Sequence, residues 1–123
     1  NNENYFSKGQ EIAIRFLNHV YFKTGVKPII YMSVSVTRDY KWDKVINGSY
    51  GLWIAQYKDK KEINGFIDNP WRDKKGIGGF PFFAIHQYTS KGLLKGYPFH
   101  LDLDKAYMTR NAWEAYAKVR CRT

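Results

Sequence analysis

The side chains best suited to chemistry in this chain lie at or near the ends of apolar segments. Asp102 stands between Leu101 and Leu103, where its carboxylate can either cap a turn or face a site. Tyr31 and Tyr57 close two further apolar segments. The face of an aromatic ring matches the apolar C–H face of a pyranose, so these rings suit sugar binding as well as core packing. Both interpretations remain open at this point.

Other chemistries find no support in the sequence. None of the three histidines lies in a recognisable motif with Asp and Ser or Cys, so a hydrolytic triad is not expected. The glycines at 76, 78 and 79 follow Lys74 and Lys75, but no Gly-Lys-Ser/Thr is present, which favours a flexible loop over a phosphate loop. Cys121 is the only cysteine, so it forms no internal disulfide and gives no metal-ligand spacing. We expect neither a metal nor a cofactor.

Size bounds the class of protein. At 123 residues with 44% hydrophobic content, the chain can form one compact domain. It is shorter than a complete eight-stranded β/α barrel, which needs about 200 residues or more. No run approaches the ~18 consecutive apolar residues of a membrane helix, and the first residues, NNEN, do not resemble a signal peptide. We therefore expect no membrane partner, and export would need upstream sequence or another route.

The net charge of +9 favours an anionic partner, either nucleic acid, acidic lipid or a bacterial wall rich in phosphate polymers. Charge alone does not choose among these. The basic residues are scattered rather than gathered on one helix, and the aromatic residues lie in apolar strands. Both features argue against nucleic acid.

Hydrophobic periodicity and turn residues predict alternating helices and strands. A first helix is expected to begin with Ser7 as N-cap and to end at Gly25, and a last helix to begin at Thr109 and end near Val119. The remaining predictions are strands at 28–32, 52–57, 82–88 and 99–103, a short helix near 39–46, a long loop at 58–80, and a turn enclosed by Gly92 and Gly96. Apolar strands with long connections favour parallel pairing in an α/β sheet, with too few strands and helices for a closed barrel.

Four segments in this order resemble glycoside hydrolase family 25, the muramidases common among phage endolysins. They are KPIIYMS at 27–33, LWIAQY at 52–57, HQYTS at 86–90 followed by two glycines, and Asp-Leu-Asp at 102–104, which is similar to the family's Asp-Leu-Asn motif. The resemblance covers about residues 7–105. It implies that the whole chain, 1–123, is part of a family 25 catalytic domain. The implied fold is the C-terminal half, strands five to eight, of an irregular TIM-like β/α barrel.

In such barrels the site lies at the C-terminal ends of the strands. The resemblance therefore implies a site in which Asp102 is a catalytic carboxylate. Trp53 has core packing as its competing interpretation, and Asp104 is expected to be a loop or cap residue. His86 should face the outer helices, because it alternates with Gln87 along the strand. The residues expected to bind substrate are Tyr31, Trp53, Tyr57, Gln87 and Tyr88.

Cleavage of a glycosidic bond normally needs two carboxyl groups. The resemblance implies that an Asp on strand one and an Asp-x-Glu pair on strand four lie upstream of the matched segments. Glu3 does not match that pair, because Asn1 stands two positions before it.

The resemblance thus implies part of a muramidase that hydrolyses the MurNAc–GlcNAc β-1,4 bond of bacterial peptidoglycan. It would act outside the cell or in the cell wall, as a phage protein released at lysis would. Its partner would be the N-terminal half-barrel or a second copy that covers the open sheet edges. The alternative is a non-catalytic module that binds cell-wall glycan.

Overall fold

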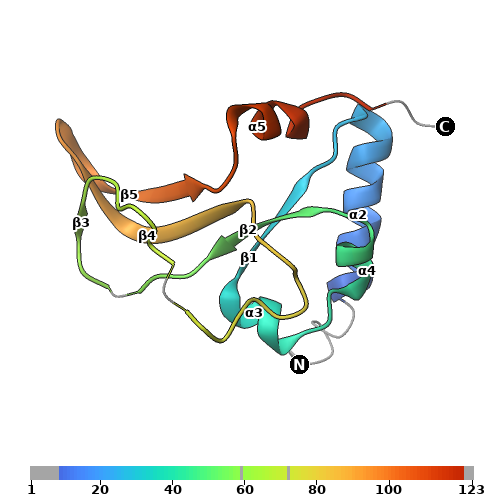
Figure 1. Ribbon diagram of the computed structural model, residues 1–123, viewed down its shortest axis with the longest axis horizontal. Helices are drawn as coiled ribbons and strands as arrows, with labels where there is room; N and C mark the ends of the chain where they lie inside the picture. Colours follow the sequence, from blue (N-terminus) through green and yellow to red (C-terminus); the bar gives the residue numbers. More distant parts are fainter. Residues whose placement is uncertain (1–8, 59, 72, 121–123) are drawn as a thin grey trace.

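The structure, a computed structural model, describes residues 9–58, 60–71 and 73–120, and it is an α/β fold built on one five-stranded sheet (Figure 1). The elements in chain order are α2 (Gly9–Thr24), β1 (Ile29–Ser33), α3 (Val34–Asp39), α4 (Asp43–Asn47), β2 (Gly51–Ala55), β3 (Ile63–Asn64), β4 (Ile85–Leu94), β5 (Tyr97–Ala106) and α5 (Arg110–Tyr116). In Figure 1 the β4–β5 hairpin projects to the left, away from α2 and α4.

Helix α2 agrees with the predicted first helix. It ends where Gly25 adopts a φ of 73°, a left-handed conformation that costs glycine little, and the Gly25 N–H donates to the Tyr21 carbonyl at 2.8 Å. The predicted N-cap Ser7 lies outside the described residues. In α5, Thr109 is the N-cap as predicted, because its side chain accepts a hydrogen bond from the Ala112 N–H.

The short helix predicted near 39–46 is confirmed in part, as α4, and a further helix that was not predicted, α3, precedes it. The chain between them is extended at Tyr40, where φ is −131° and ψ is 161°. Trp42 is buried next to this break, and its Nε1–H donates to the Val36 carbonyl at 2.9 Å. A buried indole needs such a partner, and this bond holds the break in place.

Strands β1, β2 and β4 pair in parallel, as predicted, and the short strand β3, in the segment predicted as a loop, also pairs with β4 in parallel. The last strand does not follow the prediction. Strand β5 pairs with β4 antiparallel through a two-residue turn at Lys95 and Gly96, where Gly96 has a φ of 88°. A connection this short cannot return the chain to the start of a parallel strand, so the two strands form a hairpin.

The prediction that Gly92 helps to enclose that turn is also wrong. Gly92 lies within β4, opposite Leu101. A Cβ at this position would lie 2.4 Å from the Leu103 Cγ. The glycine is needed for the close approach of the two strands and not for a turn.

One face of the sheet, called here the covered face, forms the hydrophobic core. Successive strand residues point to opposite faces, so Met32, Ile54 and His86 share this side. Helices α2 and α4 contribute Leu17 and Val45 to it. The buried core cluster comprises Leu17, Met32, Trp42, Val45, Tyr50, Leu52, Ile54, Ile77 and Phe80.

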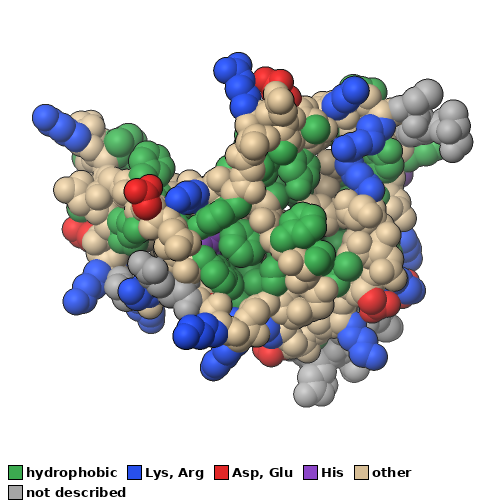
Figure 2. Space-filling view, in the orientation of Figure 1, with side chains coloured by type: hydrophobic (Ala, Val, Ile, Leu, Met, Phe, Trp, Pro, Cys, Tyr) green, Lys and Arg blue, Asp and Glu red, His purple; other side chains and the backbone are tan. Residues whose placement is uncertain are grey.

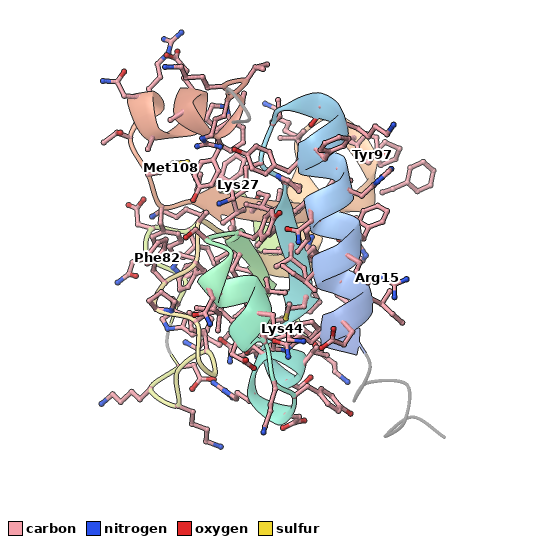
Figure 3. All side chains as sticks on the ribbon, turned by 90° about the vertical axis from the view of Figure 1, so that its right-hand side faces the viewer. Arg15, Lys27, Lys44, Phe82, Tyr97 and Met108 are labelled. Carbon is pink, nitrogen blue, oxygen red and sulfur yellow. The ribbon has the colours of Figure 1, made fainter. Side chains whose placement is uncertain are left out.

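The long segment 58–80, predicted as a loop, is partly integrated into the fold. It contains strand β3 and supplies Ile77 and Phe80 to the core. Figure 3 shows Phe82, just after this segment, on the opposite side of the molecule from Arg15, which points outward from α2. The end of the segment is therefore anchored in the core by Ile77 and Phe80, whereas most of its other described residues are exposed.

Basic side chains are distributed around the surface. In Figure 2, hydrophobic side chains gather in the middle of the visible face, and Lys and Arg side chains stand around its rim. This agrees with the scattered charge of the sequence. Within the described part of the chain, no helix is long and apolar enough to cross a membrane.

Candidate functional site

Gln87 is the centre of a hydrogen-bonded group on the other side of the sheet, called here the open face. Its Oε1 accepts the hydroxyl of Tyr31 at 2.6 Å and that of Tyr57 at 2.7 Å. Tyr31 belongs to β1, Tyr57 follows β2, and Gln87 belongs to β4. Gln87 is only 5% exposed, while Tyr31 is 50% and Tyr57 43% exposed. A buried amide thus fixes two phenols whose rings remain open to solvent.

Trp53 extends this group toward β5. Its ring is tilted against that of Tyr31, with the ring centroids 4.9 Å apart. Its Nε1–H donates to the Asp104 Oδ1 at 2.7 Å. Asp104 lies directly opposite Gln87 in the β4–β5 register. Trp53 is only half-buried, so core packing, the interpretation that competes with substrate binding, does not account for its surroundings.

Asp104 is the residue of this group that the sequence did not identify. It was expected to be a loop or cap residue, but it lies within β5. The alternation of strand residues contained the signal: Leu103 is buried, so Asp102 and Asp104 both point away from it, to the same face.

The two carboxylates differ in environment. Burial raises the pKa of Asp104, and the charge of Asp102 raises it further, while the Trp53 hydrogen bond and His86 act in the opposite direction. Asp102 is exposed on β5. Burial raises the pKa of Tyr31, with added contributions from Tyr57, Asp102 and Asp104. Both carboxylates therefore act on Tyr31.

Tyr88 is not part of this group. It is 3% exposed, and its ring centroid is 6.3 Å from that of His86, on the side of the sheet away from Gln87. Tyr88 and Gln87 were both candidates for the strand end, and the structure places Gln87 alone with the two exposed tyrosines.

His86 faces away from Gln87, as predicted, but it packs against Trp71 and Phe83 of the preceding segment rather than against helices. Burial lowers its pKa, and its Nε2 lies 3.0 Å from the Gln56 carbonyl oxygen. Since a carbonyl can only accept, Nε2 carries the proton in neutral His86 and Nδ1 does not. This histidine is a structural residue of the covered face.

A groove of about 750 Å³ opens beside the tyrosines, at the C-terminal ends of β1 and β2. Its volume falls in the range of small-molecule and sugar sites. It is lined by Tyr31, Ser33, Val34, Ala55, Gln56, Tyr57, Lys58 and Lys60.

Asp73 forms a hydrogen-bonded cluster next to this groove. Its Oδ2 accepts from the Arg38 Nη2 at 2.5 Å and from the Gln56 amide, and its Oδ1 accepts the Lys75 N–H at 2.7 Å. These hydrogen bonds, that of Arg38 first, lower the pKa of Asp73 to about 2. Asp73 thus links the long segment to Gln56, next to Tyr57. No cluster of His, Cys, Asp and Glu suited to a metal ion occurs in the described ranges 9–58, 60–71 and 73–120.

Comparison with known families decides the class. The model of glycosyl hydrolases family 25 matches residues 3–97, which is most of the chain. The chain belongs to glycoside hydrolase family 25. This family 25 chain is therefore a member of a group of glycosidases that act on peptidoglycan, which fits an open face of aromatic rings and carboxylates. No curated protein and no solved structure matches it significantly.

The match covers most of the candidate site but not all of it. Tyr31, Trp53, Tyr57 and Gln87 lie within the matched residues 3–97, whereas Asp102 and Asp104 lie just beyond them. The place of the two carboxylates in the site rests on the motif at 102–104 and on the geometry: the β4–β5 register and the Trp53 hydrogen bond.

Proposed function

We propose that this chain is the C-terminal half, strands five to eight, of a family 25 muramidase domain, and that it contributes to hydrolysis of the β-1,4 bond between MurNAc and GlcNAc in peptidoglycan. One observation carries the proposal beyond family membership. Gln87 joins the tyrosines of two strands while Asp104, opposite it, holds Trp53. A glycan placed on these rings would lie next to both carboxylates.

Each side chain has a role that its environment suits. The exposed rings of Tyr31 and Tyr57 would stack on the apolar face of a sugar, and Trp53 packs against the ring of Tyr31. Asp102, exposed beside them, would stabilise positive charge that develops on the reacting sugar. Asp104 would fix the Trp53 ring and adjust the local charge.

Hydrolysis also needs a carboxylic acid that protonates the leaving oxygen. In this proposal the acid comes from the N-terminal half of the barrel, either on the same polypeptide or on another chain. Strand β1 is an edge of the sheet, with β2 as its neighbour. An unpaired edge can accept another strand. Beside it lies an apolar groove of about 440 Å³ to which α2 contributes Ile12 and Phe16 and β1 contributes Ile29. These features support association with that half or with a second copy.

The proposal is tested by release of reducing sugar from purified peptidoglycan. We expect none from this chain alone, and release when a separately produced half carrying strands one to four of a family 25 enzyme is added. Asp102→Asn should then reduce the restored rate by about 100-fold or more, the scale of a lost electrostatic contact to a transition state. Activity of the chain alone, abolished by Glu3→Gln, would overturn the assignment of the acid.

The second candidate is a non-catalytic module that binds cell-wall glycan. It is favoured by the groove, whose exposed tyrosines and lysines suffice for binding without a catalytic acid. Retention on cell walls that persists in the reconstituted barrel without any release of reducing ends would support it. In either case the site of action we propose is the bacterial wall or the exterior of the cell, as for a phage endolysin at lysis.

A further inference from the structure

The groove beside Tyr31 and Tyr57 has an uneven supply of hydrogen-bond donors. Both tyrosine hydroxyls donate to the Gln87 Oε1, so their protons are already used. The side-chain donors that remain on the lining are the ammonium groups of Lys58 and Lys60 and groups already engaged elsewhere, such as the Gln56 amide, which donates to Asp73. The groove therefore combines exposed aromatic rings with positive charge in one lining.

The charges of the open face are separated along it. The carboxylates of Asp102 and Asp104 act on Tyr31 from β5. Lys58 and Lys60 come directly after Tyr57 in the chain, in the segment that follows β2, and they line the same groove. Neither lysine forms an ion pair with a described residue. The carboxylates thus act on Tyr31, whereas the lysines adjoin Tyr57 in the chain.

We propose that Lys58 and Lys60 form a subsite for an anionic group attached to the glycan strand. The sugar would lie on the tyrosine rings, with its reacting bond toward Asp102 and its anionic substituent toward the lysines. The shared chemistry is a carboxylate or phosphodiester on a β-linked glycan. Its sources are the peptide stem of the muramyl residue or a teichoic acid linked to the wall. This inference rests on the proposed function, since it assumes a peptidoglycan ligand.

Two exposed ammonium groups give a moderate effect that depends on salt, because exposed ion pairs are weak and are screened within about 10 Å at moderate ionic strength. The expected consequence is selectivity between charged and uncharged glycan, with a modest gain in affinity. Free sugars without an anionic group should bind on the rings alone.

The test uses the 123-residue chain in sedimentation with purified insoluble peptidoglycan. Lys58→Gln with Lys60→Gln is compared with Lys91→Gln with Lys95→Gln. Lys91 and Lys95 are exposed on the β4–β5 hairpin, outside the groove lining, so both variants lose the same charge. We expect the first variant to bind about five- to tenfold more weakly at low salt, and the second to bind within about twofold of the unchanged chain.

Three wall preparations separate the sources. One is complete, one has its teichoic acid removed by acid extraction, and one has its peptide stems removed by an amidase. The difference between the two lysine variants should disappear on the preparation that lacks the recognised group. Equal weakening of both variants would overturn the subsite and leave only non-specific attraction. If the unchanged chain binds none of the preparations, the peptidoglycan assignment itself fails.

Discussion

The two faces of the sheet come from the same strands but differ in what their side chains do. On the covered face, Ile54 and Val45 are fully buried in an apolar core. On the open face, Tyr31 and Tyr57 are about half exposed and are held by hydrogen bonds to Gln87. Alternate residues of one strand thus serve stability and binding separately. Changes on one face should therefore leave the other property largely intact.

The largest effect on stability is expected from Ile54→Ala. Truncation of a fully buried aliphatic side chain leaves a cavity and should lower the free energy of unfolding by about 2–5 kcal/mol. Urea unfolding followed by tryptophan fluorescence measures it. Ile12→Ala, at a position that is 57% exposed on α2, is the control and should change stability by about 0.5 kcal/mol or less. Similar losses in both variants would contradict the assignment of Ile54 to the buried core.

Gln87→Leu is expected to affect binding more than stability. It removes the acceptor of two phenols, but because both rings are partly exposed their hydroxyls can turn to water. We expect a loss of about 1 kcal/mol in unfolding free energy, together with clear loss of retention on peptidoglycan. Tyr57→Phe removes one of the two bonds and should have a smaller effect on both. A Gln87→Leu chain that binds normally would show that binding does not require Gln87 to fix the two tyrosine rings.

Trp53→Phe separates two interactions of one residue on the open face, its ring packing and its hydrogen bond. The ring contact with Tyr31 is largely kept, whereas the hydrogen bond to Asp104 is lost. We expect the free energy of unfolding to fall by about 1 kcal/mol. Because the charge of Asp104 raises the pKa of His86, movement of the freed Asp104 carboxylate away from His86 would lower that pKa. Unfolding and a histidine NMR titration measure the two quantities. An unchanged stability would mean that water replaces the indole without cost.

The smallest effect expected is a contrast in pH dependence between two aspartates. The pKa of Asp73 in the fold is about 2, below its usual value, so its stabilisation is present at neutral pH and is lost as the pH falls toward 2. The pKa of Asp104 is raised, so the fold favours its protonated form and loses that contribution as the pH rises through the folded-state pKa.

Unfolding measured across the acid range should therefore give opposite results for two variants. Asp73→Asn should lower the free energy of unfolding most near neutral pH, and this loss should shrink as the pH falls toward 2. The free energy of unfolding of Asp104→Asn, relative to that of the unchanged chain, should be most favourable at neutral pH, where Asp104 is charged. The altered hydrogen bond to Trp53 contributes separately. Parallel curves for the two variants would contradict the opposite pKa shifts.

The sequence predicted those elements whose pattern is local. Helix α2, strands β1 and β2, and the Thr109 cap follow from periodicity and from single capping residues. The β4–β5 hairpin was missed because Gly92 and Gly96 look alike in sequence. Only the fold distinguishes a glycine needed for close approach from one needed for a positive φ.

The candidate site was predicted in part for the same reason. The strand-end positions of Tyr31, Tyr57 and Gln87 follow from the sequence, and the structure brings them together. The choice between Gln87 and Tyr88 depends on which face each residue occupies, and a shift of one position reverses it. The face that Asp104 occupies follows from the alternation around Leu103, but its place opposite Gln87 depends on the register of a hairpin that the sequence did not reveal.

The hairpin also sets the order in which the open face can assemble. Strands β4 and β5 are neighbours in sequence and are joined by a two-residue turn, so their pairing closes a very short loop. The bonds that complete the group span far more chain, 51 residues for Trp53 to Asp104 and 56 for Tyr31 to Gln87. Contacts of long sequence separation form slowly, because the loop entropy must be overcome first. We expect β5, which carries Asp102 and Asp104, to pair with β4 early during refolding, and Tyr31 and Tyr57 to reach Gln87 last. Recovery of glycan affinity should therefore follow the final folding step.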